Sequence, residues 1–226
     1  MYFQIALLGG VIPPLLISYW TMGNFEGLFD DKKFFFYLVI GFMIGIVLSL
    51  FFIILSYSTS SYLDMSIIFV IFFALLMELI KFVILARKKI KKDFHLVFYG
   101  SALGLGIAGT FIAGLSYRYY LVHDIFGFEE VLSFILMAFS LSYTQFMCGF
   151  FVAKGIATKE ITRYMGYSFA LQALYNICLL PYIWNFHPYI TAIITAPFIF
   201  LLFIIPDKIK KTLPKEARKK LRRKNE

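Results

Sequence analysis

Residues 34–57 read FFFYLVIGFMIGIVLSLFFIILSY and contain no charged side chain. About 20 apolar residues are enough for an α-helix to cross a hydrocarbon core of about 30 Å. The rest of the chain has the same character, because 61% of the 226 residues are hydrophobic and the mean hydropathy is +0.80. Soluble domains are roughly 45–50% apolar. We therefore expect an integral membrane protein.

Seven apolar segments are each long enough to span a bilayer. They are 2–20, 34–57, 62–86, 96–117, 131–153, 164–184 and 187–205. We expect an all-α, multi-pass bundle of seven transmembrane helices in residues 1–205, followed by a basic tail in residues 206–226. The sixth segment is the least apolar, because it carries Ser168, Gln172 and Asn176. Polar residues inside a span usually face other helices or a cavity.

Basic residues are distributed unevenly between the two sides of the expected bundle. All but two of the Lys and Arg residues lie on one side, in the tail and in the loops 21–33, 86–95 and 154–163. The exceptions are Lys81, inside the third segment, and Arg118, which we place in an opposite loop at 118–130. Cytoplasmic loops carry an excess of Lys and Arg. We therefore expect a plasma-membrane protein with its N-terminus outside the cell and its C-terminus in the cytoplasm.

The formal net charge of +9 does not indicate a nucleic-acid partner, because the basic clusters adjoin hydrophobic spans. Clusters in that position are topology signals and contacts for anionic lipid. Cys148 and Cys178 lie inside apolar runs without metal-ligand spacing, which favours two buried thiols. We expect the lipid bilayer as a partner, and neither a metal nor a cofactor.

Glu78 and Lys81 are the charges of the third segment that no loop can accommodate. Each costs several kcal/mol in a bilayer unless it is paired, hydrated or close to the interface. Their i,i+3 spacing places them on one helix face, where they can pair. Two interpretations remain open: a site that faces a polar cavity, or a Lys81 side chain that extends to the interface.

Gln145 in the fifth segment joins Gln172 and Asn176 of the sixth as an intramembrane amide. These amides either hold helices together or face the same cavity as Glu78.

The fourth segment carries small residues on two faces. One contains Gly100, Gly104 and Ala108, and the other contains Gly106, Thr110 and Gly114. Small residues let helix backbones approach closely, so we expect a central, tightly packed helix.

Four motifs occur along the chain in a recognisable order. They are Met77-Glu78-Leu-Ile-Lys81, the glycine-rich run Phe98–Thr110 followed by Phe111-Ile112, Gln145-Phe-Met-Cys-Gly149, and Gln172-Ala-Leu-Tyr-Asn176. This order resembles a superfamily of intramembrane glutamic proteases and their relatives. It includes PrsW-type proteases, CAAX-prenyl-protease-like proteins, the YhfC group and Aph, the seven-helix scaffold subunit of gamma-secretase. The resemblance covers residues 65–205 and implies a seven-helix protease-like bundle.

The chain departs from the family pattern at the positions that the proteolytic mechanism of the family would use. Met77 stands where the family has a first Glu, and Gln145 and Gln172 stand where it has His. General acid–base catalysis needs groups that titrate near the working pH, and Met and Gln do not. The layout is most similar to the non-catalytic Aph subunit. We therefore expect a pseudoprotease that serves as a scaffold or binding subunit for a membrane protein, a transmembrane peptide or a lipid.

Two alternatives remain open for the function. In the first, the chain is an active intramembrane endopeptidase with Glu78 as the base. In the second, it is a small transporter subunit. Many transporters are built from inverted repeats, and the sequence shows no such repeat.

Overall fold

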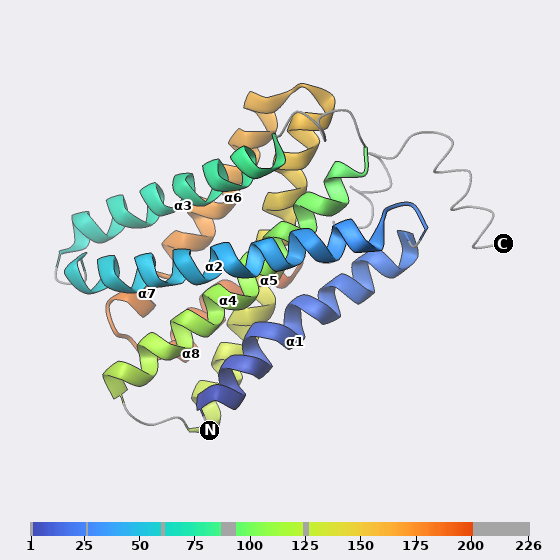
Figure 1. The fold of residues 1–226 in the computed structure, drawn as a ribbon. Coiled ribbons are helices and arrows are strands. Elements are labelled where there is room, and N and C mark those ends of the chain that lie inside the picture. The colour runs from blue at the N-terminus through green and yellow to red at the C-terminus, as the bar shows by residue number, and fades with distance from the viewer. Residues whose placement is uncertain (1, 26, 60–61, 87–93, 124–126, 201–226) are drawn as a thin grey trace.

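The computed structural model describes residues 2–25, 27–59, 62–86, 94–123 and 127–200, which form helices and short connections without a strand (Figure 1). The helices are α1 (Tyr2–Met22), α2 (Asp31–Thr59), α3 (Leu63–Leu85), α4 (Leu96–His123), α5 (Phe128–Thr158), α6 (Ile161–Cys178), α7 (Leu180–Ile183) and α8 (Pro188–Thr195). Short 3-10 turns follow α1 and α8, at Gly23–Phe25 and Ala196–Phe200. The expected all-α class is confirmed for this part of the chain. The predicted tail at 206–226 lies outside the described residues.

Four of the described helices are long and apolar enough to cross a membrane. They cover Asp31–Tyr57, Leu63–Leu85, Leu96–Val122 and Phe128–Thr158. A shorter apolar helical segment covers Pro188–Phe200. These helices indicate a membrane protein.

The sixth predicted segment is not one continuous helix. Helix α6 ends at Cys178, and Pro181 lies in the first turn of the short helix α7. Proline has no N–H to continue the hydrogen-bond ladder of a preceding helix, but it fits the first turn of a new one. After α7 the backbone turns at Asn185, whose φ is 60°, and Pro188 begins α8. The chain therefore reverses direction over a few residues.

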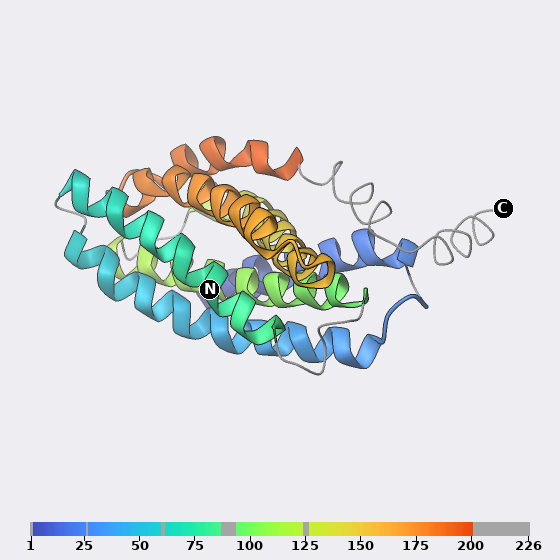
Figure 2. The same ribbon diagram turned by 90° about the horizontal axis from the view of Figure 1, so that it is seen from above.

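Helix α4 occupies the centre of the bundle. Figure 2 shows it between α2 on one side and α5 on the other, with α6 and α8 beyond α5. In its most apolar window 89% of the residues are buried, against 39% in α2 and in α3. The expected central position of the glycine-rich segment is therefore found in the structure.

The two small-residue faces of α4 lie against different neighbours. A Cβ atom added at Gly104 would lie 2.0 Å from the backbone oxygen of Gln145 in α5, and one added at Gly100 would lie 2.4 Å from the backbone oxygen of Gly149 in α5. A Cβ atom added at Gly106 would lie 2.1 Å from the oxygen of Leu38 in α2. Ala108 is fully buried. Direct backbone contact on two sides explains why residues 100–110 of α4 include no aromatic side chain.

Candidate functional site

The polar residues singled out in the sequence meet where α3, α5 and α6 pack together. The inward face of α3 follows the helical repeat and includes Val70, Ala74, Met77, Glu78 and Lys81. Met77 contacts Gln145 of α5, Glu78 contacts Ser168 of α6, and Lys81 pairs with Glu78, so this face of α3 packs against α5 and α6. None of the three has any exposed surface.

Glu78 is held by contacts to both of its carboxylate oxygens. Lys81 Nζ lies 2.6 Å from Glu78 Oε1, and the Ser168 hydroxyl of α6 makes a short hydrogen bond to Oε2. Ser168 Oγ is also 3.0 Å from the backbone oxygen of Cys148 in α5, and Cys148 Sγ is 3.5 Å from the backbone oxygen of Ser168. The charged pair of α3 is thereby connected to the α5–α6 interface.

The three amides form a chain of hydrogen bonds beside this pair. Gln145 Nε2 donates to Gln172 Oε1 at 2.9 Å, and Gln172 Nε2 donates to Asn176 Oδ1 at 2.9 Å. Asn176 Nδ2 then donates to the backbone oxygen of Val70 in α3 at 3.0 Å. Gln145 Nε2 also lies 3.7 Å from Met77 Sδ. The amide chain therefore links all three helices through Met77 and Val70 of α3.

The structure argues against the interpretation in which the Lys81 side chain extends to the membrane interface. The Lys81 ammonium is fully buried and pairs with Glu78, so the side chain does not extend to an interface. Glu78, Gln145 and Gln172 have no exposed surface and pack directly on their partners.

The chemistry open to this cluster is limited by what its atoms contact. A general base must be within hydrogen-bond reach of the proton it abstracts, directly or through one water. Both Glu78 oxygens contact side chains of the protein instead. Gln145 Oε1 is the one acceptor of the cluster that is buried without a hydrogen-bond partner among the described residues. In the same part of the chain, no three His, Cys, Asp or Glu side chains are grouped to hold a metal.

Sequence reasoning missed a second buried polar cluster around Arg118. We placed Arg118 in a loop, but it lies inside α4 and is 1% exposed. Its guanidinium donates to the backbone oxygens of Tyr182 and Ile183 and to Asn185 Oδ1, each at 3.1 Å. It also lies over the rings of Tyr57 and Tyr182. Arg118 therefore binds the carbonyl end of α7, where a cation is favourable.

Two signals in the sequence could have located this second cluster. Arg118 directly follows the fourth apolar segment, which we end at residue 117, and no Gly or Pro marks that end. The sequence therefore gives no signal that the helix stops before Arg118. Pro181 and Pro188 mark the break that leaves carbonyl groups without helical partners. A buried donor is one way to satisfy such carbonyls.

Comparison of the chain with protein-family models, with curated proteins and with solved structures finds no match. The resemblance to the glutamic protease superfamily therefore rests on the four motifs themselves.

Proposed function

We propose that this chain is a non-catalytic membrane protein of the glutamic protease type, with seven spans and the function of a scaffold or binding subunit. The observation that carries the proposal is the state of Glu78: it is fully buried, and both carboxylate oxygens contact protein side chains. A protease of this type must present its carboxylate to water and to a peptide bond. In this chain the Glu78 carboxylate instead pairs with Lys81 and joins α3 to α6 through Ser168.

The amide chain supports the same proposal. In the family pattern, the positions of Gln145 and Gln172 are occupied by His. Here their amide groups bond to each other and then to Asn176, and none of these side chains can exchange a proton near neutral pH. A buried and almost completely hydrogen-bonded network is suited to fixing one packing arrangement of α3, α5 and α6.

The proposed topology follows the positive-inside rule. Seven spans place the N-terminus outside and the basic C-terminal segment in the cytoplasm, next to the anionic lipids of the plasma membrane. The connection between α1 and α2, the connection between α3 and α4, and the connection between α5 and α6 then share the cytoplasmic side. We propose a membrane protein or a transmembrane peptide as the partner, bound on the lipid-facing helix surfaces.

The alternative of an active endopeptidase has one observation in its favour. Ser168 makes a direct hydrogen bond to Glu78, and the positions of the motifs converge although they are far apart in the sequence. If Glu78 acted as the base, this arrangement would have to open to admit water.

The experiment compares the membrane proteins that copurify with the wild-type chain and with the double variant E78Q/K81M in mild detergent. The double variant removes the carboxylate without leaving a buried, unpaired ammonium group. If the chain is a scaffold, both proteins bring down the same partner in a stoichiometric amount and with the same chain ends. Mass spectrometry identifies the partner and its termini.

The matched control is D64N, which neutralises an exposed carboxylate in the first turn of the same helix, α3. An uncleaved form of the partner that accumulates with E78Q/K81M, but not with D64N, would contradict the scaffold and support the endopeptidase. Absence of a stoichiometric partner for the wild-type chain would also contradict the scaffold.

A further inference from the structure

Helices α1 and α2 both pack against α4, and they meet at their connection and then diverge (Figure 1). Two cavities lie in the angle between them, away from the polar network. The first, of about 550 Å³, lies at the α1–α2 connection and is lined by residues that include Tyr19, Trp20, Phe29, Asp31 and Phe34. The second, of about 220 Å³, lies deeper between the helices and is lined by Gly10, Val11, Phe42, Gly109, Thr110 and Ala113.

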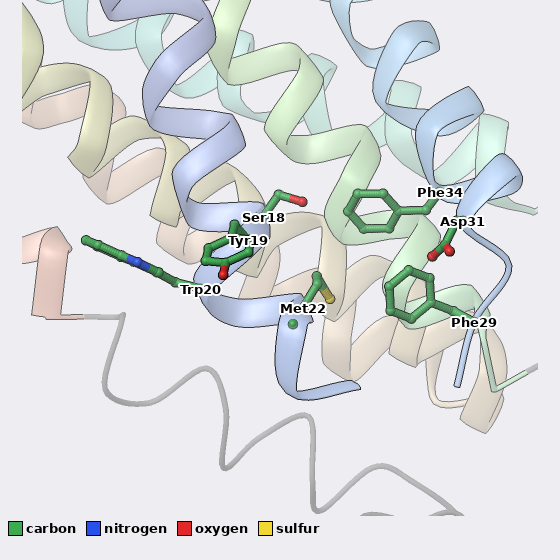
Figure 3. Close-up of a pocket in the computed structure, with 8 residues that line it drawn as sticks. Ser18, Tyr19, Trp20, Met22, Phe29, Asp31 and Phe34 are labelled. Atoms are coloured by element: carbon green, nitrogen blue, oxygen red, sulfur yellow. The ribbon is translucent and has the colours of Figure 1, made fainter. Parts of the chain in front are cut away.

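The first cavity combines aromatic rings with one carboxylate. Figure 3 shows Phe29, Asp31 and Phe34 across the opening from Tyr19 of α1, whereas the Trp20 ring points away from Asp31. Its volume is within the range of small-molecule sites, about 300–1,000 Å³. Tyr and Trp alone are common where a helix leaves the bilayer. A carboxylate beside such rings is, in addition, the combination that binds an alkylammonium group.

The second cavity is apolar. Its one hydroxyl, on Thr110, donates to the backbone oxygen of Phe42 at 3.0 Å. Gly109 supplies no side chain, and a Cβ atom there would lie 2.8 Å from the Phe42 ring. A hydrocarbon chain fits such a lining because no unpaired polar side chain has to be satisfied.

The spacing of the two cavities matches the depth of a lipid. Nine residues of α1 separate Tyr19 from Gly10, which is about 14 Å at 1.5 Å per residue. Eight residues of α2 separate Phe34 from Phe42, which is about 12 Å. One leaflet of the hydrocarbon core is about 15 Å thick. A molecule with its head group at the first cavity would therefore reach the second with an acyl chain.

We propose that the angle between α1 and α2 is a binding site for one zwitterionic phospholipid. The ammonium of the head group lies against the Asp31 carboxylate and the neighbouring rings of Phe29 and Phe34, and one acyl chain occupies the cavity beside Val11 and Gly109. Lys32 follows Asp31 and is exposed, so a cation is available next to the lipid phosphate. The site shares no residue with the polar network and does not depend on the proposed function.

The experiment is native mass spectrometry of the full chain in mild detergent, with added palmitoyl-oleoyl lipids that differ only in the head group. Phosphatidylethanolamine or phosphatidylcholine should bind as a single molecule, and phosphatidylglycerol, which lacks the ammonium, about tenfold more weakly. Preference for the ethanolamine or for the choline lipid identifies the natural head group, and either preference supports the site.

Two variants separate the two halves of the site. D31N should weaken binding of the ammonium lipids about tenfold and should not weaken binding of phosphatidylglycerol, whose anionic head group gains nothing from a carboxylate. V11F fills the apolar cavity and should weaken binding of all three lipids. The controls are D64N, an exposed carboxylate at the start of α3, and V83F, a residue of α3 that is 66% exposed.

Four results would overturn the proposal. They are no retained lipid in the wild-type chain, equal binding of phosphatidylglycerol, equal losses in the variants and their controls, and a chain dimer that V11F dissociates. The last result would assign the groove to a second copy of the chain.

Discussion

Replacing Lys81 with Met leaves the Glu78 carboxylate in the bundle without its cation. The two charged atoms are 2.6 Å apart, so at an effective dielectric constant of about 20 they attract each other by about 6 kcal/mol. Desolvation of the two ions costs several kcal/mol each and offsets much of this attraction. Removing one partner of a buried pair nevertheless destabilises a protein by about 3–5 kcal/mol, because the other charge is left uncompensated.

We therefore expect K81M to lower the midpoint of thermal unfolding by on the order of 10 °C. The double variant E78Q/K81M should recover most of this loss, because an amide can replace the carboxylate as the acceptor for Ser168 without carrying a charge. The protein supplies its own probe: Cys148 is buried and free, and a thiol-reactive fluorophore reports its exposure during unfolding. Replacing the partly buried Cys178 with Ala removes the other thiol.

The matched control is K33M, which breaks an exposed pair of the same i,i+3 spacing with Asp30. Exposed pairs contribute about 0–1 kcal/mol, so this variant should unfold near the wild-type temperature. The reasoning is refuted if K81M is as stable as the wild-type chain, or if the double variant is no more stable than K81M.

Three further changes test the packing. Gly104→Leu places a Cβ atom 2.0 Å from the Gln145 backbone oxygen, so the peak of folded monomer in size-exclusion chromatography should be lost. The control Gly166→Leu has open space around the new side chain and should elute as the wild-type chain does. Arg118→Met removes three hydrogen bonds at the end of α7 and should cost about 3 kcal/mol, with faster proteolysis after α7 as the local measurement. Gln172→Leu interrupts the amide chain and should lower stability by about 1–3 kcal/mol for each polar group left unpaired, measured by the same thiol assay.

Some features of the fold could be predicted because they depend on local sequence. Continuous apolar runs fix where helices form, and each of the seven predicted segments contains a helix as far as residue 200. The two small-residue faces of α4 follow from the spacing of Gly100 and Gly104 on one side and Gly106 on the other. Small residues at helical spacing have few uses besides close packing, so the prediction of a central helix had a physical basis.

Other features depend on contacts between distant parts of the chain and could not be predicted. Ser168 is 90 residues from Glu78, and only the packing of α3 against α6 brings them together. Hydropathy assigned Arg118 to a loop, because a cation is normally unfavourable inside an apolar bundle. Burial of Arg118 is favourable only because specific acceptors lie next to it. Those acceptors are the carbonyl groups at Tyr182 and Ile183, 64 and 65 residues later. The angle between α1 and α2 is likewise set by α4, not by either helix alone.

The glycines of α4 also have a consequence for the synthesis of the protein. Side chains that allow backbones to touch provide little hydrophobic area for holding a helix in lipid, and the hydropathy of α4 is 1.7, against 3.0 for α2. When α4 leaves the ribosome, α2 has already been made, and its Gly41 and Gly45 offer the matching surface. Early docking on α2 would compensate for the weaker partitioning of α4 until α5 arrives. Translation order thus supplies the central helix with a protein neighbour before its second interface exists.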